Sequence, residues 1–313
     1  MQLIRGIHNL RTHHYGCVLT IGNFDGVHRG HQMLLERLKQ EGQSRGLPVM
    51  VMIFEPQPLE LFSAERAPAR LTRLRDKVNY LAKAGVDYLL CVKFDARFAA
   101  NDAQTFVSKL LVEKLGVRFL VVGDDFRFGA GRQGDFLLLQ SAGLKAGFEV
   151  ISTDSFCNGG KRVSSTAVRE ALSHDDLTLA ESLLGHPYSI SGRVVHGNEL
   201  GRTIGFPTAN LPLKRQISPV SGVYAVSVYG LGDVPLPGVA NIGTRPTVTG
   251  DKRQQLEVHL LDVTMDLYGR YIEVVLRKKI RNEQRFASLE ALKQQIADDV
   301  VTARIFFGLK TPV

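Results

Sequence analysis

The sequence predicts two domains of different fold class: a Rossmann-like α/β domain with a parallel sheet, then a small antiparallel β-barrel with a C-terminal helix. The chain has 313 residues, enough for two cores at roughly 100–200 residues each. Strand-like and helix-periodic segments alternate as far as Leu184, whereas β-type stretches dominate after Gly185. We therefore expect domains at residues 1–185 and 186–313.

The N-terminal region has the pattern of repeated βα units. The expected strands are Val18–Ile21, Val49–Phe54, Tyr88–Val92, Phe119–Val122 and Phe148–Ser152. The expected helices are Gly30–Gln43, Arg73–Ala84, Ala103–Leu115, Asp135–Ala146, Thr166–Leu172 and Leu177–Leu184. Such alternation predicts a parallel sheet with helices on both faces and ligands outside the carboxyl ends of the strands.

The C-terminal region offers short strand-like stretches separated by Gly, Pro and Asn, which is typical of a small barrel. The strand candidates are Tyr188–Val195, Gly222–Tyr229, Leu236–Asn241, Gln255–Asp262 and Tyr271–Arg277. We expect a final helix near Leu289–Ala303 to pack on this barrel.

Composition favours a cytoplasmic protein with small-molecule partners. The three cysteines are widely spaced and lie in no metal-ligand pattern. The longest apolar run, about Leu47–Phe54, is far short of the roughly 18 residues that a membrane span needs. The formal net charge is +8, but the basic residues are dispersed, so we expect no nucleic-acid or membrane partner. A positive field equally attracts polyphosphate anions. The oligomeric state cannot be read from the sequence.

A first phosphate site is predicted where the segment Ile21–His31 passes from a strand into a helix. His28 and His31 are three residues apart, which places both imidazoles on one face of the first helical turn. There they lie beside free backbone N–H groups and the positive end of the helix dipole. The pattern suits attack by a phosphate oxygen on the α-phosphorus of ATP, with pyrophosphate leaving. One histidine could instead simply cap the helix.

Two further segments carry chemistry in this domain. In Val163–Arg169, Ser165 or Thr166 can cap a helix, with Arg169 one turn later. An ordinary capped helix with a surface arginine fits equally well. The loop Val121–Arg132 holds two phenylalanines and three glycines, which suits a flat ring bound against an exposed loop, although the aromatic residues could be core.

A second phosphate site is predicted in the β region, in the Gly-rich segment Gly192–Asn210. Pro207 fixes the local backbone, so Thr208 and Asn210 project on one side of an extended segment. A hydroxyl and an amide oxygen are hard ligands suited to a Mg²⁺ that also holds ATP phosphates. An asparagine after proline is also common as a plain turn residue.

A candidate base follows from alternation in Gln255–Leu260. Leu256 and Val258 share one face of the expected strand, and Glu257 and His259 share the other. A strand packed on a core would therefore turn the carboxylate away from that core, where it can accept a proton. An exposed strand glutamate with no catalytic role has the same pattern.

Several of these motifs resemble known signatures in the N-terminal domain. The H-x-G-H pair resembles the HIGH-type signature of the nucleotidyltransferase superfamily, and Val163–Arg169 resembles its I-S-S-T-x-x-R motif. Gly123–Gly129 resembles the G-x-D-F-x-F-G motif of FAD synthetases, and Phe54–Phe62 their F-x-P-H-P-x-x-x-F motif. Gln57 stands where many members have histidine, which puts an imidazole role at that position in doubt.

The C-terminal motifs resemble riboflavin kinases. The sequence P-T-A-N ending at Asn210 is their characteristic motif, and Glu257 matches the glutamate of E-x-H-L that is their proposed general base. Asn241–Thr247 and Leu276–Phe286 also resemble the family. The order of motifs resembles that of bacterial bifunctional riboflavin kinases and FAD synthetases along essentially the whole chain. The resemblance implies conversion of riboflavin to FMN and of FMN to FAD, with ATP as co-substrate and Mg²⁺ as cofactor.

The site residues so expected fall into four groups. The catalytic candidates are Glu257, His28, His31 and Arg169. The ATP-binding candidates are Gly22, Asn23, Phe24, His28, His31, Ser164, Ser165, Thr166, Arg169, Gly197, Gly201, Arg202, Thr208 and Asn210. The flavin-binding candidates are Phe62, Asp125, Phe126, Phe128, Arg285 and Phe286. The metal-binding candidates are Thr208 and Asn210.

Two alternatives remain. A nucleotidyltransferase could act on another phosphorylated acceptor, such as phosphopantetheine or nicotinamide mononucleotide; the aromatic loop and the kinase motifs argue against it. A flavin-binding or nucleic-acid-binding module without turnover would leave two Gly-rich phosphate sites unexplained, and it predicts salt-sensitive polynucleotide affinity or flavin retained without ATP consumption.

Overall fold

The computed structural model describes residues 1–123, 125–153, 157–158, 161–197, 205–213, 217–246, 252–263 and 265–310. The chain divides into two compact units: Met1–Pro68 with Thr72–Ser165, and Ala69–Leu71 with Thr166–Val313. The expected boundary between residues 185 and 186 stays a prediction.

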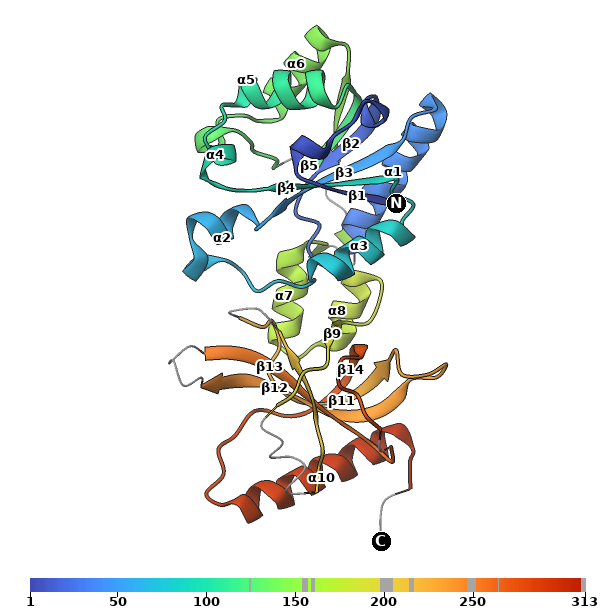
Figure 1. Ribbon diagram of the computed structural model, residues 1–313, viewed down its shortest axis with the longest axis vertical. Coiled ribbons are helices and arrows are strands. Elements are labelled where there is room, and N and C mark those ends of the chain that lie inside the picture. The colour runs from blue at the N-terminus through green and yellow to red at the C-terminus, as the bar shows by residue number, and fades with distance from the viewer. Residues whose placement is uncertain are drawn as a thin grey trace. The chain divides into compact units, whose positions relative to one another are not determined.

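The first unit is built on a parallel sheet of six strands, in the order β1-β4-β3-β2-β5-β6 (Figure 1). Its strands are β1 (Gln2–Arg5), β2 (Cys17–Ile21), β3 (Val49–Glu55), β4 (Tyr88–Lys93), β5 (Val117–Gly123) and β6 (Glu149–Thr153). This confirms the expected parallel sheet. Strand β1 was not expected from the sequence: it has four residues, and it pairs along the outer side of β4.

Helices cover both faces of this sheet. The α-helices are α1 (Arg29–Arg45), α2 (Pro58–Phe62), α3 (Leu74–Lys83), α4 (Ala96–Ala99), α5 (Ala103–Thr105) and α6 (Phe136–Ala146). Short 3₁₀ turns lie at Ile7–Asn9, Thr12–His14, Ala64–Arg66 and Ala130–Arg132, and a small hairpin joins β7 (Cys157–Asn158) to β8 (Lys161–Arg162). Alternate residues of β2 enter different cores: Val18 packs with residues of α1 and α3, and Leu19 with residues of α6 and the segment after α5.

The helix expected over Ala103–Leu115 changes type along its length. Only α5 is α-helical, and Phe106–Lys114 forms a π-helix. The N–H of Leu115 donates to the carbonyl of Leu110, five residues earlier, at 3.0 Å. The wider turn places Phe106, Val107, Leu110 and Leu111 in the core, a pattern that 3.6-residue periodicity does not separate from an α-helix.

The second unit contains α7 from Thr166 onward, α8 and a six-stranded antiparallel sheet in the order β10-β13-β12-β11-β14-β9. Its elements are α7 (Ser165–Ser173), α8 (Leu177–Leu184), β9 (Ser189–Arg193), β10 (Ala209–Pro212), β11 (Gly222–Tyr229), β12 (Leu236–Pro246), β13 (Lys252–Leu260), β14 (Tyr271–Arg281) and α10 (Leu289–Phe307). An isolated bridge between Val195 and Asn210 joins the two edges, so the sheet curls into a nearly closed barrel, as expected.

Helix α10 covers one outward face of the barrel. Ala303 packs against Val223 and Ala225 of β11. Beside this contact, Arg281 of β14 grips the buried carboxylate of Asp299 on α10: its Nε lies 2.8 Å from Oδ1 and its Nη2 2.8 Å from Oδ2. This two-pronged ion pair attaches the last helix to the barrel.

The four basic residues of the segment Arg277–Arg281 lie on strand β14. Arg277 donates to the Ser227 hydroxyl at 3.0 Å, and Lys279 lies 2.7 Å from the Asp175 carboxylate. Asp175 also accepts from the buried Tyr224 hydroxyl at 3.2 Å. Arg277 and Lys279 therefore make these contacts within the second unit.

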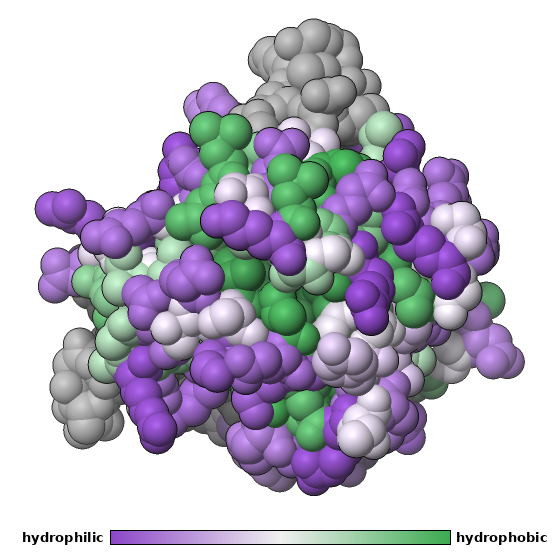
Figure 2. Space-filling view, turned by 90° about the horizontal axis from the view of Figure 1, so that it is seen from above, coloured by the Kyte–Doolittle hydropathy of each residue, from purple (hydrophilic) through white to green (hydrophobic). Residues whose placement is uncertain are grey.

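Among the described residues, no helix combines the length and apolar character needed to traverse a bilayer. In a space-filling view, hydrophilic side chains are spread over the visible face, with apolar areas between them (Figure 2).

We predict that Asp299→Ala lowers the free energy of unfolding of this unit by about 3–5 kcal/mol, because it leaves the Arg281 guanidinium without its partner carboxylate. Asp298, the next residue, is exposed and serves as a matched control; Asp298→Ala should change stability by less than about 0.5 kcal/mol. Chemical denaturation monitored by circular dichroism measures both, and equal effects would contradict the prediction.

Candidate functional site

The motif loops of the first unit meet at one edge of its sheet. Strand β2 lies between β3 and β5, although β5 comes much later in the chain. The strand order therefore reverses beside β2, and a crevice outside the carboxyl ends of the strands is expected there. The H-x-G-H loop follows β2, the Phe54–Phe62 motif begins in β3, and the aromatic loop follows β5. All three motifs thus lie at the edge formed by the carboxyl ends of the strands.

The turn after β2 is held in an unusual backbone conformation. Phe24 has φ of 48° and Val27 φ of 42°, values that side chains bearing a Cβ rarely adopt. The buried Asp25 secures the turn, because its Oδ1 accepts from the Thr72 backbone N–H at 3.0 Å. The Thr72 hydroxyl in turn accepts from the Gly26 N–H at 3.0 Å. Strain of this kind persists where surrounding contacts fix it, and it is common at binding sites.

His28 and His31 form a stacked pair at the start of α1. His28 is the N-cap, and its Nδ1 accepts from the His31 backbone N–H at 3.4 Å. The two ring centroids are 3.7 Å apart, and the Phe24 ring lies 4.7 Å from that of His31. A side chain at Gly30 would meet the His28 ring at 3.2 Å and the backbone oxygen of Val163 at 3.3 Å. Both imidazoles therefore lie together at the positive end of the helix.

His31 is electrically neutral at pH 7. Burial lowers its pKa well below the usual range, and the neighbouring His28 and the fully buried Lys77 lower it further. The ring keeps some exposed surface, but its Nδ1 is enclosed and has no hydrogen-bond partner in the protein. A buried ring nitrogen without a partner fits a ligand or a water at this position.

The S-S-T-x-x-R segment is tied to the same turn through Ser165. Its hydroxyl donates to the Asp25 carbonyl at 2.8 Å, so the first residue of α7 is fixed to the H-x-G-H loop. Ser164 is half-buried beside it.

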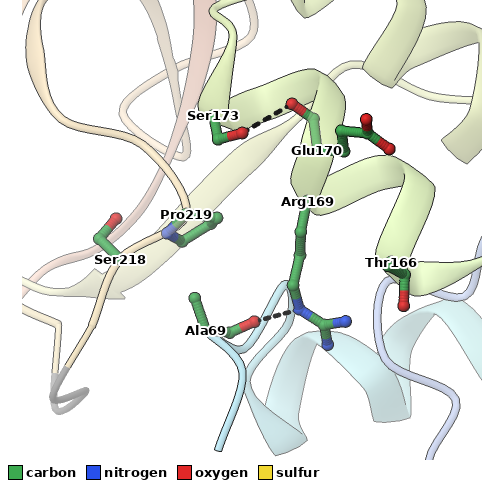
Figure 3. Close-up of a pocket in the computed structure, with 7 residues that line it drawn as sticks. All are labelled: Ala69, Thr166, Arg169, Glu170, Ser173, Ser218 and Pro219. Atoms are coloured by element: carbon green, nitrogen blue, oxygen red, sulfur yellow. Dashed lines mark hydrogen bonds between the residues drawn. The ribbon is translucent and has the colours of Figure 1, made fainter. Parts of the chain in front are cut away.

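Further along α7, Thr166 and Arg169 line a cavity of about 490 Å³ in the second unit. The Arg169 Nε donates to the Ala69 carbonyl at 2.5 Å, and Figure 3 shows its side chain running from α7 toward Ala69. The remaining lining residues are Glu170, Ser173, Ser218 and Pro219.

The expected flavin-binding residues of the first unit differ in exposure. Phe128 is buried in the core beside Phe106, and Phe126 stacks on it with some exposed surface. Asp125 is exposed, and Phe62 is 65% exposed, meeting the edge of Phe94. The rings of Phe126 and Phe62 are therefore accessible to solvent, whereas Phe128 is buried and packs against Phe126.

Gln57, in the place of the family histidine, is buried at the start of α2. Its backbone N–H donates to Glu60 at 2.9 Å, while its side-chain Nε2 is enclosed and has no partner in the protein. Gln57 therefore presents a neutral donor at the position where many members of the resembled family have histidine.

The barrel site is organised by strand register. Glu257 on β13 pairs with Asn210 on β10 and with Asn241 on β12, so these three residues form a row across neighbouring strands. Directly paired residues share a face of a sheet. Leu256 and Val258 are fully buried and Glu257 is only half-buried, which confirms the expected alternation along β13. The row continues to Val223, on the outward face where α10 packs.

Asn210 is the most confined polar residue of this row, at 5% exposed. Its backbone carbonyl accepts from the Val195 N–H at 2.9 Å. Its carboxamide lies flat against Gly197, where any side chain would overlap it. Gly197 is thus required for close approach to Asn210.

The remaining expected residues of this site have varied positions. Thr208 is half-buried two residues before Asn210, and Gly201 and Arg202 lie outside the described residues. Arg285 is exposed, and the half-buried Phe286 lies under the Arg281 guanidinium at 5.6 Å. In the described part of the chain, no group of three His, Cys, Asp or Glu side chains is placed to hold a metal ion. A metal here would take a hydroxyl and an amide from the protein and the rest from phosphate and water.

Sequence reasoning missed several residues at both sites. They are Asp25, Thr72, Lys77, Asn241 and Gln255. Asp25 lies inside the H-x-G-H motif, and Gln255 and Asn241 lie in segments that already resembled riboflavin kinases, so position within a motif was an available signal. Lys77 follows the period of α3 and gave no signal.

A parallel α/β unit with paired histidines at its switch point, joined to a barrel bearing P-T-A-N and a facing glutamate, defines a two-site nucleotide-dependent transferase. A family model described as FAD synthetase matches residues 10–167, and one described as riboflavin kinase matches residues 184–307. The bifunctional riboflavin kinase/FMN adenylyltransferase of Escherichia coli strain K12 is 74% identical over 313 residues, 100% of both chains. That of Haemophilus influenzae is 55% identical over 308 residues, 98% of this chain and 100% of its own.

A solved structure described as a macrolide-efflux protein from Streptococcus pneumoniae aligns with a TM-score of 0.79 and 29% identity, covering 97% of this chain and 99% of its own. The efflux description applies to that protein alone. The chain belongs to the bifunctional riboflavin kinase/FMN adenylyltransferase family. It is an enzyme of flavin biosynthesis with ATP as co-substrate, and its FAD synthetase region precedes its riboflavin kinase region.

We predict that the buried, neutral His31 makes the protein less stable in acid. Below about pH 6.5 the unfolded chain binds a proton at this position that the folded chain does not, so stability falls as the pH falls, by at most about 1.4 kcal/mol per pH unit for one proton. His31→Gln should flatten this slope. Denaturation midpoints between pH 5 and 8 measure it, and exposed His8→Gln is the control. An unchanged slope in His31→Gln would refute the prediction.

Proposed function

We propose that the two reactions are catalysed at two separate sites: FMN adenylylation at the switch-point edge of the parallel sheet, and riboflavin phosphorylation on the outward face of the barrel. The observation that carries this assignment is the clustering of motifs. The region that matches FAD synthetase contains the stacked His28 and His31, and the region that matches riboflavin kinase contains the strand-paired Asn210 and Glu257. The family match also favours riboflavin and FMN over the other acceptors considered.

In the adenylylation, a phosphate oxygen of FMN attacks the α-phosphorus of ATP, the bond to the β-phosphate oxygen breaks, and pyrophosphate leaves. We assign His28 and His31 to the ATP phosphates, because both rings lie at the helix N-terminus, where anions are stabilised. Gly22, Asn23, Phe24, Ser164 and Ser165 complete the proposed nucleotide site in this unit, and the expected roles of Thr166 and Arg169 in ATP binding stay predictions. His31 is neutral, so it acts as a hydrogen-bond donor rather than as a fixed cation. Phe62, Asp125, Phe126 and Phe128 are assigned to the flavin.

In the phosphorylation, Glu257 accepts the proton of the riboflavin 5′-hydroxyl while that oxygen attacks the γ-phosphorus of ATP, and ADP leaves. The half-buried carboxylate on the outward face suits this role, because it reaches solvent and substrate but not the apolar core. Gly197, Gly201 and Arg202 are assigned to ATP, and Arg285 and Phe286 to the flavin.

We assign Mg²⁺ to Thr208 and Asn210. The residues fit the ion: an amide oxygen and a hydroxyl are hard ligands, and Gly197 leaves room for the Asn210 carboxamide that a side chain would fill. When bound, the ion neutralises phosphate charge and lowers the barrier to transfer of the γ-phosphoryl group.

The substrates and products riboflavin, FMN, FAD and ATP are the small-molecule partners. A cytoplasmic location is supported by the buried Cys17, which forms no disulfide; burial raises the pKa of its thiol to about 12. The absence of nucleic-acid and membrane partners stays a prediction.

Substitution at the barrel site should remove FMN formation alone. We expect Glu257→Ala to slow riboflavin phosphorylation at least about 100-fold, the usual cost of losing a general base, and Asn210→Ala to abolish it. Conversion of supplied FMN to FAD should survive both changes. Purified protein is incubated with ATP, MgCl₂ and either flavin, and products are separated by chromatography over time. Exposed Glu290→Ala is the control. Loss of both reactions would count against separate sites.

Substitution at the switch-point edge should have the reverse effect. His28→Ala and His31→Ala should stop FAD formation from FMN because phosphate charge in the transition state is no longer stabilised, while riboflavin is still converted to FMN. The same chromatographic assay measures both steps, with exposed His174→Ala as control. FAD formation at the wild-type rate would remove these two residues from the proposed site.

A further inference from the structure

The Asn210 carboxamide is oriented by contacts at both of its ends. Its Nδ2 donates to the backbone carbonyl of Thr208 at 3.4 Å. Its Oδ1 accepts a hydrogen bond from Nε2 of Gln255, on the neighbouring strand β13. The flat side of the carboxamide lies against Gly197.

These contacts agree on which end of the amide is the oxygen. A carbonyl such as that of Thr208 can only accept, so the end of Asn210 that faces it is the NH₂ group. The other end must then be the oxygen, and Gln255 meets it with a donor. The network is self-consistent, whereas rotating the amide by 180° would place two oxygens against one another at Thr208.

Gln255 reaches Asn210 because of its position on β13. It lies two residues before Glu257, on the same face of the strand, and its register partner on β10 is Pro212. The contact to Asn210 is therefore the diagonal one between neighbouring strands, within reach of a long side chain. Pro212 contributes no side-chain donor to compete for it.

We propose that Gln255 is a positioning residue for the kinase reaction: by donating to Asn210 Oδ1, it keeps that oxygen turned toward the metal position before the metal arrives. The inference rests on the proposed role of Asn210 as a metal ligand. A carbonyl oxygen has two lone pairs, so one can accept from Gln255 while the other faces the ion. Partners that orient a metal ligand in this way typically contribute 10–100-fold to metal affinity or activity.

The test compares Gln255→Met, which keeps the length of the side chain but removes the donor, with Gln254→Met, one residue earlier on the opposite face of β13. Gln255→Ala is the second variant should the methionine disturb folding, and an unchanged denaturation midpoint qualifies each protein. Mn²⁺ is titrated into full-length protein with a non-hydrolysable ATP analogue, and free Mn²⁺ is measured by electron paramagnetic resonance. Asn210→Ala identifies the component of binding that belongs to the barrel.

We expect both Gln255 variants to weaken that component about 10–100-fold and to raise the Mg²⁺ concentration needed for half-maximal riboflavin phosphorylation by a similar factor. The KM for riboflavin and the Mg²⁺ requirement of FMN adenylylation should not change. Gln254→Met should match the wild type.

The Asn210 and Gln255 variants distinguish a failure of the positioning role of Gln255 from a failure of the metal site itself. If Asn210→Ala removes the barrel component but the Gln255 variants bind Mn²⁺ like Gln254→Met, the inference is overturned and the metal role of Asn210 stands. If Asn210→Ala itself leaves Mn²⁺ binding unchanged, the proposed metal site and the inference fall together.

Discussion

Strand β13 is held between β10 and β12 in a register that cannot slip by one residue without turning Glu257 into the apolar interior and Leu256 out of it. That single constraint aligns the proposed base, the proposed metal ligand and the residue proposed to orient that ligand, because all three depend on which strand positions face one another. The arrangement requires little else from the barrel than its closure at Val195 and Asn210. The chemistry of this site is thus a consequence of strand pairing rather than of a specialised loop alone.

Both sites place glycine where a side chain would collide with a functional group. Gly30 leaves space beside the His28 ring, and Gly197 beside the Asn210 carboxamide. In each case the neighbouring polar group is nearly buried, and the backbone that lies against it restricts its orientation. Fixed groups lose little entropy when a nucleotide binds, which favours precise placement of phosphates.

Features with a short sequence period were predictable, and contacts between distant residues were not. The alternation of apolar and polar residues along β13 predicted that Glu257 faces away from the core. The βα pattern predicted the parallel sheet, at one edge of which the motifs lie. Asp25 and Thr72 are 47 residues apart in the sequence, and Gln255 and Asn210 are 45 apart. Because local sequence patterns span only a few residues, they predict neither contact. For the same reason β1 was not predicted from the sequence. It has only four residues, and its strand conformation depends on pairing with the distant β4 rather than on its own composition.

The compact units do not coincide with two uninterrupted lengths of chain. Ala69–Leu71 belongs by its contacts with residues from Thr166 onward, and the Ala69 carbonyl receives the Arg169 guanidinium. A division near residue 165 would place that donor and that acceptor on different polypeptides, whereas a division near residue 185 would keep both on the first. A split gene encoding two separate enzymes would therefore retain this contact only if it divided the chain after Arg169, which restricts where fission of the two activities can occur.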